Sequence, residues 1–226
     1  MNNCLETLCI RNRQLQNLSA HNERFNRTRM ALWNVTDPTH LQDVIQLPNW
    51  LLPHETYKCR VTYGPEVEKI EFDLYHLRPV RSLVLMESNG LEYSHKYANR
   101  QPIDALFAQR KTADDILMVR GGLLTDTSYA NVALFDGSRW HTPARPLLEG
   151  TQRARLLREG ILVSADIRPT DLSHFQCIKL LNAMLDWEQT EAIPTTAVYA
   201  FEPFTTPVKL INVIYQAIIN KQIVNI

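Results

Sequence analysis

Glycine is scarce in this chain, with seven among 226 residues. Neither G-x-G-x-x-G nor G-x-x-x-x-G-K-[ST] can be built from these positions, so the two common glycine-rich phosphate loops are excluded. The four cysteines form no C-x-x-C pair, and no cluster of histidines and cysteines has the spacing of zinc ligands. We therefore expect no metal site, and we expect the thiols to stay free in a reducing compartment.

An excess of charge of one sign is also missing, because Lys+Arg and Asp+Glu both total 24. A broad electrostatic attraction to nucleic acid or to anionic lipid is therefore not expected. No apolar run approaches the roughly 20 residues that a membrane span needs, and Asn2, Asn3 and Glu6 interrupt any signal peptide. The composition, which is 45% hydrophobic and 21% charged, is ordinary for a globular protein. The sequence predicts a cytoplasmic protein with no nucleic-acid or membrane partner.

The first part of the chain mixes strands and helices. In the stretch 56–63, Tyr57, Cys59, Val61 and Tyr63 share one face, which indicates a strand with one buried side. The other elements predicted here are a strand at 4–10, a helix from Ser19 (its N-cap) to about Trp33, a short helix from Asp37 to Leu47, and strands at 67–74 and 82–86. The polar stretch 87–92 is interpreted as a linker, so we expect two lobes, at 1–86 and 92–226.

The second lobe is also predicted to mix strands and helices. Asp136-Gly137 is the strongest hairpin signal in the chain. The predicted elements are a helix at 101–111, a strand at 115–119, a helix after Gly150, a strand at 161–165, a helix from Asp171 to about Leu185, a strand at 195–200 and a helix at 207–220. Strict alternation of strand and helix is missing. The predicted fold class is therefore α/β of the mixed α+β kind rather than a doubly wound sheet.

Two charged residues near the linker and in a polar loop could carry chemistry. Lys96 follows the linker and could face a cleft between the lobes, where a desolvated lysine loses its proton and can form a Schiff base. Its position alone is more typical of a solvated surface lysine. Asp126 lies in the polar stretch 123–131 and is either a fixed buried charge or part of a loop of Asx and Ser/Thr turns.

Two further segments could bind an anion. Gly150 lets the backbone approach a ligand, and Thr151 offers a backbone N–H and a hydroxyl at a helix N-terminus. A plain helix cap is the alternative interpretation. Arg24 lies on an arginine-rich helix that is either a solvated face or the carrier of an anion clamp.

Taken together and in order, these segments resemble the class IV aminotransferases, which are pyridoxal-phosphate enzymes of fold type IV. The resemblance runs from about Leu5 to Met184, and its specificity comes from six matching segments with compatible spacing. They are 4–10 (similar to the F-E-T-[IL] strand), 19–25 (H-x-x-R-L), 96–100 (K-x-x-N-R of the lyase group), 125–131 (T-E-x-x-x-x-N), 140–143 with 148–153 (T-P…L-x-G-[IT]-x-R) and 181–184 (N-A-[LM]).

The resemblance implies roles for particular residues. Lys96 would hold the aldehyde of pyridoxal 5'-phosphate and act as base and acid at the substrate Cα, and Asp126 would pair with the pyridine nitrogen. Arg24 would bind the phosphate. The remaining implied cofactor residues are Asn131, Gly150, Thr151, Gln152, Asn182 and Ala183. For the substrate we expect Arg60, Asn99 and Arg100 to contribute. Arg60, Arg78 and Arg81 are possible clamps for a substrate carboxylate, and no motif fixes which of them binds it.

The implied protein is a two-lobed enzyme similar to D-amino-acid aminotransferase, with the cofactor between the lobes and a homodimeric assembly. The K-x-x-N-R segment favours a lyase that converts aminodeoxychorismate into 4-aminobenzoate and pyruvate. A class IV aminotransferase acting on branched-chain or D-amino acids is the alternative.

Two departures keep a non-catalytic protein of the same fold as a third interpretation. The pyridine partner of the family is usually Glu, where this chain has Asp126. Family members also usually carry a further strand-forming segment before the F-E-T strand, where this chain is short.

Overall fold

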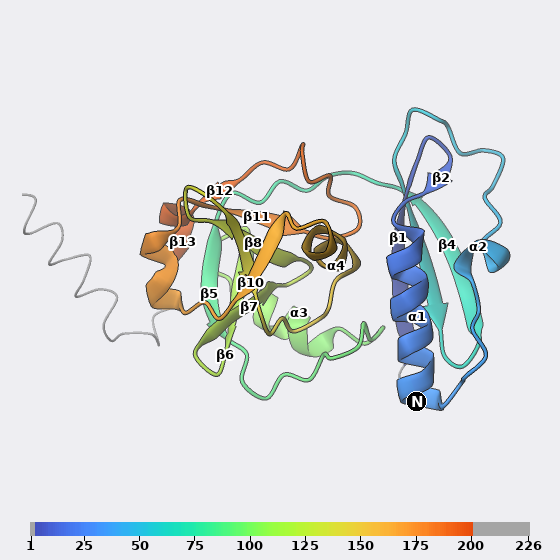
Figure 1. Cartoon of the computed structure of the whole chain (residues 1–226), viewed down its shortest axis with the longest axis horizontal. Helices are drawn as coiled ribbons and strands as arrows, with labels where there is room; N and C mark the ends of the chain where they lie inside the picture. Colours follow the sequence, from blue (N-terminus) through green and yellow to red (C-terminus); the bar gives the residue numbers. More distant parts are fainter. Residues whose placement is uncertain (1–2, 201–226) are drawn as a thin grey trace, which may run out of the picture.

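Two β-sheets organise the fold, and the computed structural model describes them within residues 3–200 (Figure 1). The first sheet has the strand order β2-β1-β3-β4. The elements of this part are β1 (Cys4–Arg11), β2 (Gln14–Leu15), α1 (Leu18–Trp33), α2 (Leu41–Val44), β3 (Tyr57–Tyr63) and β4 (Val67–Leu74). Successive neighbours in this sheet are antiparallel.

The second sheet has nine strands, in the order β10-β9-β8-β7-β6-β5-β13, with β11 paired to β8 and β12 to β11. The elements of this part are β5 (Leu83–Glu87), α3 (Gln101–Phe107), β6 (Asp115–Arg120), β7 (Leu123–Thr127), β8 (Asn131–Phe135), β9 (Trp140–Pro143), α4 (Thr151–Arg158), β10 (Leu162–Ala165), β11 (Cys177–Leu181), β12 (Ile193–Pro194) and β13 (Val198–Tyr199), with 3-10 turns at Pro169–His174 and Thr195–Ala197. Parallel and antiparallel pairs occur together, so the predicted mixed fold class is confirmed.

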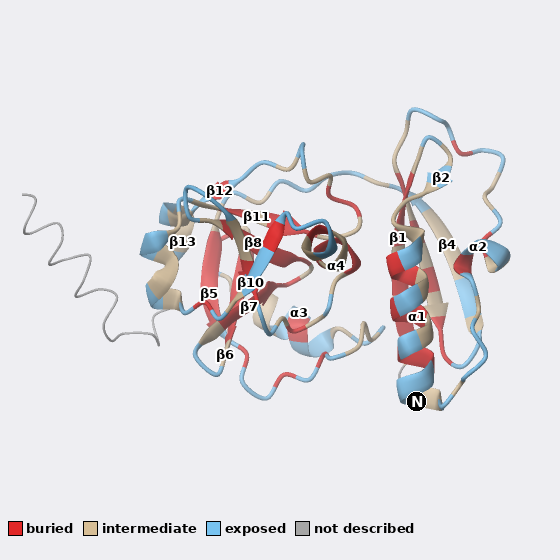
Figure 2. Ribbon diagram, viewed as in Figure 1, coloured by how far each residue is buried: buried red, intermediate tan, exposed pale blue. Residues whose placement is uncertain are grey.

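The first sheet has one apolar face and one polar face. The alternation predicted in β3 is confirmed, because its apolar residues are buried and pack with Phe25 of α1. Figure 2 shows buried stretches of α1 next to β1. Thr7, Lys58 and Arg60 lie on the opposite face, which lines a cavity shared with the second half of the chain. Burial of the apolar face fixes the register, because a shift by one residue would turn the polar side chains into the core.

The second sheet is covered on both faces, so its central strands are apolar throughout. Ile116, Leu117 and Met118 are consecutive in β6 and fully buried. Alternate residues of this strand belong to two different core clusters, one on each side of the sheet. Such continuous burial is typical of a strand packed on both sides.

Several predicted elements differ in the structure because tertiary pairing prevails over local signals. The helix predicted from Asp171 to Leu185 is wrong. A 3-10 turn at Pro169–His174 is followed by β11, which pairs with β8 and buries Ile178 and Leu180. The strand predicted at 195–200 is a 3-10 turn followed by the short β13.

Helix boundaries also differ from the prediction. The N-cap of α1 is Asn17, which is left-handed with φ of 52°, rather than Ser19. The short helix predicted at 37–47 contracts to α2, and the helix predicted at 101–111 ends at Phe107. The helix predicted at 207–220 lies outside the described residues.

The strand predicted at 82–86 belongs to the second sheet. It corresponds to β5, which pairs in parallel with β6 rather than with β4. A boundary at 86 would cut this strand away from its neighbours. We therefore propose that the division into two lobes, if it is made by sheets, falls between Leu74 and Leu83. Within residues 3–200 no helix is both long and apolar enough to cross a membrane.

Candidate active site

A cavity of about 320 Å³ lies where the two halves of the chain meet. The first half contributes residues from β1, α1 and β3, and the second contributes β7, β8, the start of α4 and the segment after β11. Of the residues with implied roles, those that line it are Arg24, Arg60, Lys96, Arg100, Asp126, Asn131, Gly150, Thr151, Asn182 and Ala183. Segments far apart in sequence therefore converge on one site.

Two implied residues lie away from the cavity lining. Gln152 is buried at the start of α4, where its Oε1 accepts a hydrogen bond from Arg155 Nε at 3.3 Å. Asn99 is exposed, and its Oδ1 accepts from the Gln101 N–H at 3.1 Å at the start of α3. Arg100, next to it, lines the cavity and donates from Nη2 to the Ser128 carbonyl at 2.7 Å.

The backbone from Lys96 to Ala98 is hydrogen-bonded to the start of the first strand and to the residue before it. The Leu5 N–H donates to the Lys96 carbonyl at 2.8 Å, and the Ala98 N–H donates to the Asn3 carbonyl at 2.7 Å. Burial of the ammonium group, followed by the positive charge of Arg24, lowers the pKa of Lys96 to about 8. About a tenth of the amine is therefore uncharged at pH 7, far more than for an ordinary lysine, which suits a nucleophile or a base.

Asp126, on β7, also lines the cavity and is 5% exposed. Its Oδ1 accepts from Asn131 Nδ2 at 2.9 Å, and its Oδ2 accepts from the Leu148 N–H at 2.8 Å. Burial raises the pKa of Asp126 to about 6, against these hydrogen bonds, which lower it. The carboxylate is held in one orientation, and a cationic partner in the cavity would favour its ionised form.

Gly150 is required by distance rather than by backbone torsion. Its φ of −73° is accessible to any residue, but a Cβ atom there would lie 2.0 Å from Asn131 Oδ1. The same Asn131 amide donates to Asp126 and to the Leu148 carbonyl. A side chain at 150 would therefore displace the amide that orients Asp126.

The Arg24 guanidinium is fixed by a buried carboxylate. Its Nε and Nη2 donate to the two oxygens of Glu6 at 2.8 and 2.7 Å. Glu6 is fully buried in β1, where burial alone would raise its pKa, but Arg24 and hydrogen bonds from His21 and Arg24 lower it to about 2. Arg24 also contacts the Glu149 carbonyl through Nη1 at 3.3 Å.

The network continues through His21 to the second half of the chain. Since a carboxylate only accepts, His21 Nδ1 donates to Glu6 Oε2 at 2.6 Å. Burial lowers the pKa of His21, so the ring is neutral and its Nε2 accepts from the Thr151 hydroxyl at 3.2 Å. Asn17 Nδ2 donates to the Thr151 carbonyl at 3.0 Å. The first turn of α4 is thus attached to α1.

The sequence reasoning missed Glu6 and His21 as part of the site. Glu6 occupies an inward position of β1, between Cys4 and Leu8 on the apolar face. An acid at such a position needs a buried cation, and His21 and Arg24 lie three residues apart on one face of the predicted helix. That combination was the available signal.

The cavity fits a ligand with an aldehyde, a basic ring nitrogen and a phosphate. Lys96 supplies an amine of lowered pKa for the aldehyde, and the buried Asp126 suits a protonated ring nitrogen. Arg24 and Thr151, at the start of the eight-residue helix α4, suit a phosphate. These are the three functional groups of pyridoxal phosphate.

A family comparison agrees with this arrangement. The family model for amino-transferase class IV matches residues 3–193. The chain belongs to this family. The class IV resemblance, the predicted fold type IV and the prediction that the protein is an enzyme are thereby confirmed.

Two other proteins are similar to most of this chain. An uncharacterized protein of Haemophilus influenzae is 36% identical over 181 residues, covering 79% of this chain and 96% of the relative. The crystal structure of a candidate 4-amino-4-deoxychorismate lyase from Haemophilus somnus 129pt has 29% identity and a TM-score of 0.77. That match covers 81% of this chain and 97% of the other.

A third comparison concerns the fold of class IV proteins alone. The PLP-bound form of a hypothetical aminotransferase from Mycobacterium tuberculosis has 17% identity and a TM-score of 0.69. It covers 85% of this chain and 80% of the other. The Mycobacterium tuberculosis protein, which has the same fold, was solved with pyridoxal phosphate bound.

Replacing Gly150 by alanine should disturb the site. Because the new Cβ overlaps Asn131, we expect the Gly150→Ala protein to lose about 1–3 kcal/mol of unfolding free energy and to bind pyridoxal phosphate more weakly. Denaturant unfolding and cofactor titration measure both effects. Gly64→Ala is the control, since a Cβ there meets its nearest atom, Glu68 Oε1, at 3.4 Å. Equal behaviour of the two variants would contradict the distance requirement.

Replacing Glu6 by glutamine should leave the Arg24 charge buried without its partner, at a cost of about 3 kcal/mol at pH 7. The native pKa of Glu6, about 2, lies below the unfolded value of about 4.3. Its stabilisation is therefore complete above the unfolded value and is lost as the pH falls towards 2. The difference between wild type and Glu6→Gln should shrink from pH 7 to pH 3 in denaturant unfolding. A constant difference would argue against this, and exposed Glu66→Gln serves as the control.

Proposed function

We propose that this chain is a pyridoxal-phosphate-dependent lyase that converts 4-amino-4-deoxychorismate into 4-aminobenzoate and pyruvate. The observation that carries the proposal is the pairing of Lys96, whose pKa is lowered, with buried Asp126 in one cavity. The K-x-x-N-R segment at Lys96 and the similarity to the Haemophilus somnus candidate lyase favour this reaction.

Pyridoxal phosphate, when bound, supplies a ring that accepts electrons from the substrate Cα. In this proposal Asp126 keeps the proton on the ring nitrogen. The proton at the substrate Cα moves to and from Lys96 Nζ, which suits a base because burial lowers its pKa to about 8. Arg24 and Thr151 hold the phosphate, together with Ala183 in the segment after β11.

For the substrate carboxylates we propose Arg60 and Arg100, which both line the cavity. Arg60 lies on the polar face of β3, beside Lys58, which forms an ion pair with Asp73 at 3.2 Å. Asn99, exposed and at the start of α3, is the weakest of the proposed substrate residues. We further propose that the protein is a homodimer, as the family resemblance implies. We also propose that it is cytoplasmic, because the cysteines of the described residues are free.

Lys96 is the residue to test for cofactor attachment. The purified protein should be yellow, and borohydride should bleach it and add the reduced cofactor mass to the peptide that contains Lys96. Lys96→Ala should lack the visible band, whereas Lys69→Ala, at an exposed position of β4, should keep it. A band that persists in Lys96→Ala would show that another lysine is used. A colourless wild type that cannot be reconstituted would refute the enzymatic proposal.

The reaction itself distinguishes lyase from aminotransferase. Supplied with 4-amino-4-deoxychorismate, the protein should release pyruvate and 4-aminobenzoate in equal amounts, measured by a coupled pyruvate assay and by fluorescence. Lys96→Ala should reduce the rate to background. If no pyruvate is formed while glutamate-dependent amination of keto acids occurs, the chain is a class IV aminotransferase instead. A protein that binds the cofactor and shows neither activity would favour the non-catalytic interpretation.

A further inference from the structure

A second cavity of about 340 Å³ lies beside the candidate active site. Tyr75, Tyr129 and Met184 line both cavities, so the two share one wall. Tyr75 follows β4 in the first half of the chain, and Met184 follows β11 in the second. The second cavity is therefore also formed by both halves, next to the segment that carries Ala183.

The size of the first cavity indicates that a large substrate must extend beyond it. Ligand pockets commonly span about 300–1,000 Å³, and about 320 Å³ is at the lower end of that range. A cofactor with a pyridine ring and a phosphate takes up much of this volume. The distal part of a ring-bearing substrate then needs adjoining space, and the second cavity adjoins the first.

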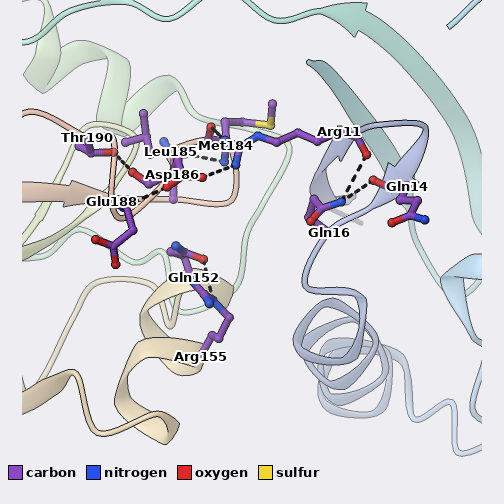
Figure 3. Close-up of polar contacts among 11 residues, drawn as sticks. Arg11, Gln14, Gln16, Gln152, Arg155, Met184, Leu185, Asp186, Glu188 and Thr190 are labelled. Carbon is purple, nitrogen blue, oxygen red and sulfur yellow. Dashed lines mark hydrogen bonds and ion pairs between the residues drawn. The ribbon is translucent and has the colours of Figure 1, made fainter. Parts of the chain in front are cut away.

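Both arginines that line the second cavity have hydrogen-bond partners. Arg11 Nη1 forms an ion pair with Asp186 Oδ2 at 2.6 Å and its Nη2 donates to the Met184 carbonyl at 3.3 Å (Figure 3). Arg78 donates to the Asp114 carbonyl and lies 5.1 Å from the centre of the Phe107 ring. Arg11 is neutralised by Asp186, whereas Arg78 donates to a carbonyl, so the charge of Arg78 can also attract a carboxylate carried by a ring.

The rest of the lining is aromatic and aliphatic. Tyr75 and Tyr129 supply ring faces and phenol groups, while Leu77, Val80 and Leu180 supply apolar surface. Burial raises the pKa of Tyr75 and raises that of Tyr129 to about 12, so both phenols keep their protons and can donate hydrogen bonds. Flat apolar surfaces with a few donors suit a six-membered carbon ring that carries oxygen substituents.

We propose that the second cavity is the subsite for the ring of the amino substrate, with Tyr75 and Tyr129 at the junction between the reacting amine and that ring. This inference rests on the proposed function, because the substrate named there has such a ring. In this proposal, residues of the second cavity make the protein prefer amino compounds that carry a ring over small amino compounds.

The test fills the second cavity and leaves the first intact. Val80→Trp and Leu77→Trp add bulk at positions that line only the second cavity. Leu77 is 65% exposed, so that variant should fold even if Val80→Trp does not. Leu74→Trp is the matched control, since Leu74 is exposed on β4 and lines neither cavity. The probe is 4-aminobenzoate, titrated by calorimetry into protein loaded with pyridoxal phosphate.

Both filling variants should bind 4-aminobenzoate at least tenfold more weakly than wild type, whereas Leu74→Trp should match wild type. The dissociation constant of pyridoxal phosphate should be the same in all four proteins. Unchanged 4-aminobenzoate binding in a folded filling variant, or no binding to wild type, would overturn the subsite. A parallel loss of cofactor affinity would show that the space serves the cofactor, and would overturn it too. Calorimetry measures binding and needs no turnover. The subsite can therefore be tested even if the lyase assay detects no activity.

Discussion

The buried carboxylate of Glu6 is the group on which the rest of the site depends. An ionised carboxylate without exposed area is costly unless it is fully hydrogen-bonded and paired. Here Arg24 occupies both oxygens and His21 donates to one of them. In return the carboxylate fixes the guanidinium that faces the cavity and sets which nitrogen of His21 carries the proton. Through His21 the constraint reaches Thr151, so one ionised group in β1 orients residues on α1 and α4.

The same strand also sets the position of Lys96. Leu5 of β1 and Asn3 just before the strand form backbone hydrogen bonds with the chain at 96–98, while the apolar face of β1 carries Glu6. Hydrogen bonds to the β1 segment therefore position both Lys96 and Arg24, although the two residues are far apart in the sequence. Asp126 is positioned within the second sheet, where Asn131 at the start of β8 donates a hydrogen bond to it. The distance between Arg24 and Asp126 thus depends on how the two halves of the chain pack together. Exposed ion pairs between the halves, such as Arg27–Glu149, stabilise this packing only weakly.

Much of this arrangement was readable in the sequence because the informative residues are local. The alternation of β3, the helix before Trp33 and the Asp136-Gly137 turn follow from periodicity and turn chemistry. β11 could not be read in this way. Its residues lie between a polar turn and the N-A-M segment, and only pairing with β8 makes them a strand.

The side-chain partners were harder to predict than the segments that carry them. Gln152 and Thr151 are neighbours in one motif, yet only Thr151 lines the cavity, because successive residues of a helix point in different directions. The role of Glu6 depends on a contact between a strand and a helix, which a motif does not state. Local patterns thus predicted most of the residues that line the cavity, whereas the orientation of each group depends on the packing of the two sheets.

The close approach of Gly150 to Asn131 has a consequence for relatives of this chain. Positions 131 and 150 share one small volume, so their side chains cannot vary independently. A homologue with alanine at the position of Gly150 should carry a shorter residue at the position of Asn131, and it would then need another donor to hold the acid at the position of Asp126. We therefore expect these three positions to covary among homologues. An alignment of their sequences alone would then reveal this packing constraint.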